Sequence, residues 1–252
     1  FFSATLLPIQ YYKSLLSTDP DNYAIYAETT FTEDQRLLLF GNDVSTKYTR
    51  RNASEFKRMA DYIRKVVHCK KGNYMAFFPS YKLMQQVYEE FMELDGGMAK
   101  SICQESGMKE EAREAFLQSF EEEYDTSFVA FCVMGGIFSE GIDLTNDKLI
   151  GAIVVGTGLP QISNEREILK NYYDHVSGDG FDYAFRFPGI NKVLQAAGRV
   201  IRTTEDRGII LLLDERFLQS DYQGLYPREW AKREICNVSN VEEKVLDFWK
   251  KL

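Results

Sequence analysis

Apolar runs alternate with segments of helical periodicity along most of this chain. Four short runs rich in β-branched or aromatic residues predict buried strands at residues 74–78, 127–134, 149–155 and 209–213. Helical spacing of apolar residues predicts helices from Asn52 to about Cys69, from Ser80 to the breaker Gly96-Gly97, in the acidic segment between Glu105 and Asp125, at residues 164–173, and from Ile190 into segment 195–202.

Strands that alternate with helices are typical of βαβ units and of a mainly parallel sheet. We therefore expect an open α/β layer sandwich over residues 23–213, followed by a polar, aromatic C-terminal tail. In such sheets ligands bind beyond the carboxyl ends of the strands, so the loops at those ends are the first places to search for chemistry.

Composition narrows the function classes. The chain has 252 residues, of which 44% are hydrophobic, so it can bury a substantial core without disulfides or a metal. This length fits one α/β domain with appendages or two small domains. The formal net charge is −8, which argues against a protein that coats nucleic acid nonspecifically, although local basic clusters are compatible with it.

Neither metal binding nor membrane insertion is indicated. Cys69, Cys103, Cys132 and Cys236 are scattered without a C-x-x-C pair, and we expect reduced thiols in a cytoplasmic protein of bacterial origin. No apolar run is long enough for a membrane span, and no signal peptide is recognisable. The sequence starts within a hydrophobic stretch without Met, and we expect it to be a piece of a longer protein.

Two predicted strands are followed by residues suited to phosphate. Ser80-Tyr81 opens a helix, where a hydroxyl and backbone amides can hold a phosphate, although an ordinary N-cap serine also explains Ser80. The segment 135–143 contains three glycines with Ser139, Glu140 and Asp143. Its spacing Gly136-x-x-x-x-Gly141 resembles the opening of a P-loop, but the phosphate-binding lysine is absent, so this loop cannot serve a self-sufficient P-loop ATPase.

The segment Gln195-Ala-Ala-Gly198-Arg199-Val-Ile-Arg202 has two arginines three residues apart after a glycine. On a helix this spacing would place both guanidiniums on one face. Such a pair suits a triphosphate whose transferring phosphoryl group gains charge, which is the role of an arginine finger. A solvated basic turn with surface ion pairs is the alternative.

The strand at residues 209–213 ends in Asp214-Glu215, which resembles a Walker B strand whose carboxylates hold a magnesium-bound water. Without a P-loop lysine, we favour a structural role. Asp214 is expected to pair with Arg216 or Arg207.

Taken in order, these segments resemble the C-terminal motor half of the XPD/DinG-like superfamily-two DNA helicases. Residues 2–6 resemble helicase motif III, 76–81 motif IV, 136–143 motif V and 195–202 motif VI, and 206–217 resemble the strand that follows motif VI. The Ser-Glu-Gly-Ile-Asp and Gln-x-x-Gly-Arg-x-x-Arg motifs in this order carry the resemblance. It implies a RecA-like, P-loop-NTPase-like three-layer sandwich at residues 17–252, after the end of a first motor domain or a linker at residues 1–16.

The resemblance also implies roles for individual residues. Gln195, Arg199 and Arg202 would be catalytic and face the triphosphate, and Gly141, Asp143 and Gly198 would bind ATP. The residues implied to contact DNA are Ser80, Tyr81, Ser139 and Arg51, with Arg50 and Lys192 as further basic candidates. The residues implied to couple DNA binding to ATP hydrolysis are Ser3, Thr5 and Glu140.

A helicase of this family would act on single-stranded DNA, for example in DNA repair, and would pair this half with its N-terminal motor domain. That domain would hold most of the ATP and Mg²⁺, and any iron–sulfur cluster would lie there and not in this chain. We therefore expect the chain alone to be inactive. Two alternatives stay open. One is a catalytically inert RecA-like module that binds nucleic acid or protein. The other is an intact RNA helicase or nuclease-associated motor, since these motifs do not reveal contacts to a 2′-hydroxyl.

Overall fold

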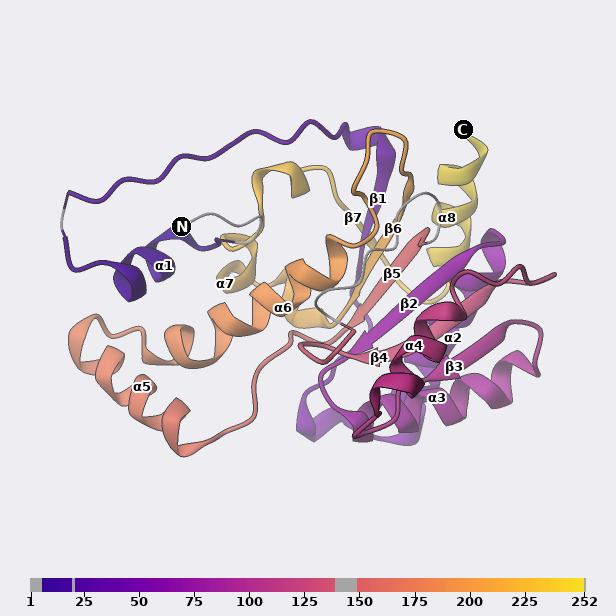
Figure 1. Ribbon diagram of the computed structural model, residues 1–252, viewed down its shortest axis with the longest axis horizontal. Helices are drawn as coiled ribbons and strands as arrows, with labels where there is room; N and C mark the ends of the chain where they lie inside the picture. The colour runs from indigo at the N-terminus through magenta and orange to yellow at the C-terminus, as the bar shows by residue number, and fades with distance from the viewer. Residues whose placement is uncertain (1–5, 20, 139–148, 252) are drawn as a thin grey trace.

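In the part of the chain that the structure describes, the strands form one seven-stranded sheet (Figure 1). The computed structural model describes residues 6–19, 21–138 and 149–251. Every strand pair is parallel, in the order β3-β4-β2-β5-β6-β1-β7. The strands are β1 (Arg36–Gly41), β2 (Asn73–Phe78), β3 (Lys100–Cys103), β4 (Phe128–Val133), β5 (Gly151–Val155), β6 (Gly208–Leu213) and β7 (Glu234–Cys236). The predicted α/β class with a parallel sheet is confirmed.

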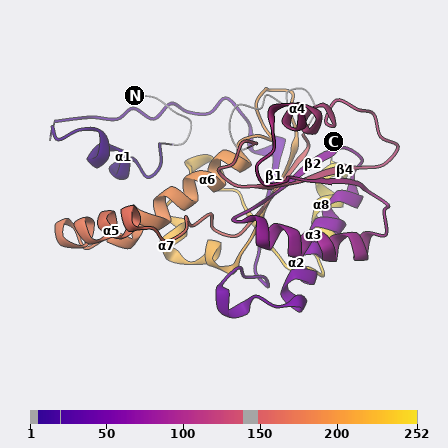
Figure 2. The ribbon, with the colours of Figure 1, turned by 60° about the horizontal axis from the view of Figure 1, so that its bottom comes forward.

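Helices cover both faces of this sheet, which explains why its central strands are buried along almost their whole length. One core cluster lies beneath α2 (Ala53–Cys69), α3 (Tyr81–Asp95) and α8 (Val241–Lys250). The other lies beneath α4 (Glu110–Gln118) and α6 (Phe187–Ala197), and Figure 2 shows α4 on the opposite face from α2 and α3. The remaining α-helices are α1 (Ile9–Leu16), α5 (Asn164–Val176) and α7 (Ser220–Gln223).

Local signals set the helix boundaries that the sequence predicted well. The Asn52 side chain accepts a hydrogen bond from the Glu55 N–H at 3.0 Å and caps α2. Gly96 ends α3 in the left-handed region, at φ 61°, where a side chain would be strained.

Other predictions were incomplete or wrong. The acidic helix is only nine residues long and ends at Gln118, because the following residues form turns. Strands β1, β3 and β7 were not predicted, and neither were α1 and α8. The sandwich also extends beyond residue 213, because β7 pairs with β1 and the buried Val241 and Val245 of α8 join the core.

A substitution of Gly208, the first residue of β6, tests how tightly Val200 and Ile150 pack against this strand. A Cβ at this position would lie 2.3 Å from Val200 Cγ1 and 2.6 Å from the Ile150 carbonyl oxygen. We expect Gly208→Ala to lower the free energy of unfolding by about 1–3 kcal/mol, the usual cost of overpacking. Gly224→Ala is the matched control, since nothing lies within 4 Å of its added Cβ. Equal denaturation midpoints for the two variants would contradict this packing.

Candidate functional site

The topology gathers three of the four chemically distinctive segments at one edge of the sheet. In a parallel sheet all carboxyl ends share an edge, and Ser80, Gly135 and Asp214 come shortly after β2, β4 and β6. The loop after β1 reaches the same edge, at the bottom of Figure 1. We call this the carboxyl edge, and the opposite one the amino edge.

Ser80 is the N-cap of α3, and its Oγ accepts a hydrogen bond from the Leu83 N–H at 3.3 Å. The next residue, Tyr81, is 37% exposed. Its hydroxyl accepts from Gln104 Nε2 at 2.9 Å, and Gln104 Oε1 accepts from the Val133 N–H at 2.8 Å. Tyr81 is thereby tied to the carboxyl end of β4, so the expected motif IV residues and the start of the motif V segment lie together.

Only the first part of the motif V segment belongs to the described residues. Gly135 has φ 69°, and the half-buried Lys192 side chain of α6 packs against it. Burial and the neighbouring charge of Arg166 lower the pKa of Lys192. The predicted site residues Ser139, Glu140, Gly141 and Asp143 lie outside the described residues, as do Ser3 and Thr5.

Asp214 is the centre of a buried cluster at the carboxyl ends of β6 and β1. Its Oδ2 accepts from the Thr46 N–H at 2.8 Å and from Thr46 Oγ1 at 2.7 Å. Arg216 donates from Nε to Oδ1 and from Nη2 to Oδ2, both at 2.8 Å. Of the two expected partners Asp214 takes Arg216, and with no exposed surface its carboxylate has the structural role we favoured over a Walker B role.

These contacts also set the ionisation of Asp214. Burial alone would raise the pKa of its carboxyl, but hydrogen bonds and charge from Arg216, together with the Thr46 donors, hold that pKa below its ordinary value.

The loop after β1 contains the expected basic candidates Arg50 and Arg51, and it adds Lys47, which sequence reasoning missed. Lys47 pairs with Glu215 at 2.9 Å, and Arg50 bridges Glu215 and Glu55, each at 3.1 Å. Arg51, an expected DNA contact, is exposed and donates from Nε to the Thr46 carbonyl at 3.1 Å. The available signal was the polar segment 42–52 directly after the apolar run of β1, which identifies a strand-end loop.

The arginine segment lies at the other edge. Helix α6 starts where Gly189 packs against Gly158, just beyond the carboxyl end of β5, and the chain after α6 packs Val200 against Gly208 at the start of β6. Gln35, immediately before β1, donates to the carbonyls of Thr204 and Asp206, each at 3.0 Å. The helix therefore crosses the sheet and delivers the arginines to the amino edge.

The prediction that both arginines lie on one helical face is wrong. Helix α6 ends at Ala197 with Gly198 as its C-cap, so Arg199 and Arg202 follow the helix. The chain turns there because the Asp206 carboxylate accepts hydrogen bonds from the N–H groups of Arg202 and Thr203, each at 2.7 Å. Arg199 is only 7% exposed, whereas Arg202 and Gln195 are half-buried.

The described residues offer no metal centre, since they contain no group of three or more His, Cys, Asp or Glu side chains placed to hold a metal ion. The thiols are protonated near neutral pH, because burial raises the pKa of Cys103 to about 11 and that of Cys69 to about 12. In the described part of the chain, no helix is long and apolar enough to cross a membrane.

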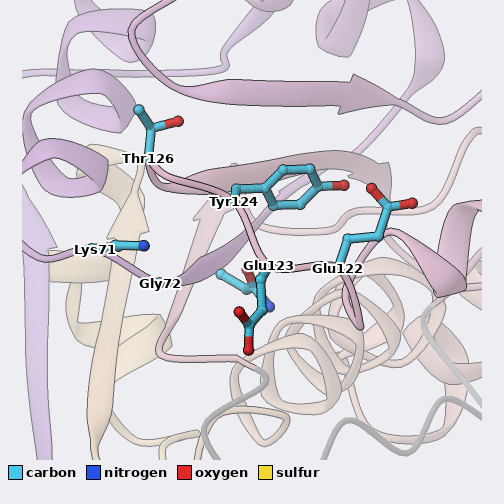
Figure 3. A pocket seen from close by; sticks show the side chains of 7 residues that line it. Lys71, Gly72, Glu122, Glu123, Tyr124 and Thr126 are labelled. Atoms are coloured by element: carbon cyan, nitrogen blue, oxygen red, sulfur yellow. The ribbon is translucent and has the colours of Figure 1, made fainter.

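The protein also has a pocket of about 180 Å³. Figure 3 shows side chains from the segments that precede β2 and β4, so the pocket opens at the amino ends of those strands. Its lining residues are Lys71, Gly72, Asn73, Glu122, Glu123, Tyr124 and Thr126. It contains none of the residues predicted to bind ATP or DNA.

The Asp214 cluster predicts a specific stability defect and acid sensitivity. Asp214→Ala leaves the Arg216 charge buried without its partner and should lower the free energy of unfolding by about 3–5 kcal/mol. Because the pKa is depressed in the folded state, this stabilisation is present above the unfolded pKa of about 3.9 and is lost as the pH falls through the lower folded value.

Thermal unfolding between neutral pH and the acid range measures both effects. Asp34→Ala, which removes an exposed carboxylate paired with Lys232, should leave the melting temperature nearly unchanged. An Asp214→Ala variant as stable as this control would refute the structural role.

Comparisons with known proteins agree with the fold and the order of the motifs. Over 204 residues the chain is 28% identical to the ATP-dependent DNA helicase XPD of Sulfolobus acidocaldarius, covering 79% of this chain and 34% of that protein. It is 25% identical over 232 residues to the human regulator of telomere elongation helicase 1, covering 83% of this chain and 19% of that protein. The chain thus spans about a third or less of these relatives. They are archaeal and eukaryotic and give the expected bacterial origin no support.

Solved structures confirm the RecA-like fold class. A structure described as XPD helicase superposes with a TM-score of 0.64 at 23% identity, covering 80% of this chain and 35% of the other. The structure of Xpd4 from S. tokodaii gives a TM-score of 0.60 at 15% identity, covering 87% and 42%. The helicase C-terminal domain family matches residues 63–233, which is more than half of the sequence. The chain therefore belongs to the helicase C-terminal domain family, of the XPD-like kind that the order of its motifs predicted.

Proposed function

We propose that this chain is the second motor domain of an ATP-dependent DNA helicase. It presents arginine side chains to ATP held mainly, with Mg²⁺, by the first motor domain, and it helps to grip single-stranded DNA. The observation that carries this proposal is the placement of two sets of predicted residues at opposite edges of one sheet. The motif VI segment lies at the amino edge, and Ser80 and Arg51 lie at the carboxyl edge.

Arg202 is the best candidate for the arginine that stabilises charge on the transferring phosphoryl group. Its side chain is half-buried, and its backbone is fixed by Asp206. Such fixing favours catalysis, because a positioned guanidinium needs no reorganisation at the moment of reaction. Arg199, whose side chain is buried, is proposed to act with Arg202, and Gln195 and Gly198 belong to the same proposed nucleotide site. Gly141 and Asp143 belong to the same proposal.

The carboxyl edge is proposed to contact DNA through Ser80, Tyr81 and Arg51, joined by Ser139. Neutral donors and few unpaired cations release few counterions, so this domain alone should bind single-stranded DNA weakly. Ser3, Thr5 and Glu140 are proposed to couple DNA binding to hydrolysis. The division at residues 16 and 17 stays part of this proposal, as does the inactivity of the chain alone, which lacks a phosphate-binding lysine.

Arg202→Ala in the full-length helicase should reduce the turnover number for ATP hydrolysis by roughly 10³-fold, the scale of losing an arginine finger, with a much smaller effect on ATP binding. Steady-state hydrolysis and nucleotide binding measure the two quantities. Arg207→Ala removes an exposed arginine a few residues away and is the matched control. Arg199→Ala should reduce the turnover number by a similar factor. Because the Arg199 side chain is buried, the melting temperature of this variant must be measured as well, to detect a loss of stability. Near-normal turnover in both Arg202→Ala and Arg199→Ala would favour the alternative of a basic turn with surface ion pairs.

Ser80→Ala in the full-length helicase should impair DNA-stimulated hydrolysis more than DNA-independent hydrolysis. Loss of one hydrogen bond to a charged phosphate should raise the single-stranded DNA concentration for half-maximal stimulation by roughly tenfold. Ser80→Thr keeps both the hydroxyl and the helix cap and should stay close to wild type. Unchanged half-saturation and unchanged maximal stimulation in Ser80→Ala would leave Ser80 as a cap only.

A further inference from the structure

Tyr48 is an unusually exposed aromatic side chain at the carboxyl edge. It begins the short 3₁₀ turn Tyr48–Arg50 in the loop after β1, and 86% of its surface is accessible. Three strand spacings separate β1 from β2 in the sheet order. At about 4.8 Å each, they place this loop about 14 Å along the edge from the strand that precedes Ser80.

The loop that carries Tyr48 is anchored by residues before and after Tyr48 in the sequence. Before it, Thr46 is bound through its N–H and its hydroxyl to the buried Asp214, and Lys47 pairs with Glu215. After it, Arg50 pairs with both Glu55 and Glu215. An exposed ring on a fixed loop loses little conformational entropy when a ligand binds, so this geometry favours binding.

Arg51 adds a cation beside the ring. Its Cζ lies 6.0 Å from the centroid of the Tyr48 ring. Among the described residues no carboxylate lies within ion-pair distance of Arg51. The neighbouring carboxylates of Glu55 and Glu215 each already meet two cations. The loop therefore presents an aromatic face and a positive charge to solvent.

We infer that Tyr48 and Arg51 form a contact site for single-stranded DNA, in which the Tyr48 ring stacks on a base and Arg51 meets the adjacent phosphate. An aromatic platform next to a cation is the combination with which proteins hold single strands without reading their sequence. This inference rests on the proposed DNA grip and adds to it a base contact, whereas Ser80 contacts only the backbone.

Binding of the chain to fluorescent oligo(dT) and to an abasic oligonucleotide of the same length, at low salt, separates stacking from phosphate contact. Tyr48→Ala should weaken oligo(dT) binding by about 5- to 150-fold, the range for losing one base–aromatic stack, and should leave abasic binding nearly unchanged. Tyr48→Phe should keep wild-type affinity. Tyr23→Ala removes a side chain that is 84% exposed on the segment before β1 and should have no effect.

The outcomes distinguish this inference from the proposed DNA grip. If Tyr48→Ala weakens the affinity for both oligonucleotides equally, or for neither, the stacking contact is overturned. Because 86% of the Tyr48 surface is exposed, misfolding of the variant is a poor explanation for either result. If Ser80→Ala weakens binding to both oligonucleotides while Tyr48→Ala weakens neither, the grip stands and the inference falls. If the wild-type chain binds neither oligonucleotide, both fall.

Discussion

The seven strands that the structure describes all run in the same direction, and this parallel arrangement determines where the loops and their side chains lie. Each connection must return across a face of the sheet, so both faces are covered and the strands are buried. Every strand then begins at one edge and ends at the other. Residues that follow strands gather at the carboxyl edge, and residues that follow a returning helix arrive at the amino edge. Ser80 and Arg202 are separated in space for this reason alone.

The pairing of β1 with β6 links these two edges. Six residues of each strand are in register, from Arg36 opposite Gly208 to Gly41 opposite Leu213. Polar contacts close both ends of this pair. At the amino edge Gln35 holds the chain that follows the arginines, and at the carboxyl edge Asp214 holds the loop after β1. Buried polar groups with satisfied partners give these two loops defined positions.

The sequence predicted the parts of this structure that depend on local patterns. Apolar runs identified four central strands, and capping residues such as Asn52 and Ser80 set helix starts. The two outermost strands, β3 and β7, have only four and three residues, which is too few for a periodic pattern. They depend on pairing with β4 and β1. The end of α6 could not be read from Arg-x-x-Arg spacing, because the turn depends on Asp206 and on Gln35, which is distant in sequence. Gly198 was a local signal for the helix end, whereas the Gln35 contacts leave no local signal.

In the function we propose, one domain has its nucleotide-facing residues and its DNA-facing residues at opposite edges of its sheet. Amide hydrogen exchange of the full-length helicase tests it directly, with a nucleotide transition-state analogue and single-stranded DNA each added alone. We expect the analogue to slow exchange in residues 198–206 and to leave residues 45–51 and 80–83 unchanged, and we expect DNA to have the reverse effect. Slowed exchange in the same segment by both ligands, or in neither segment by either ligand, would contradict it.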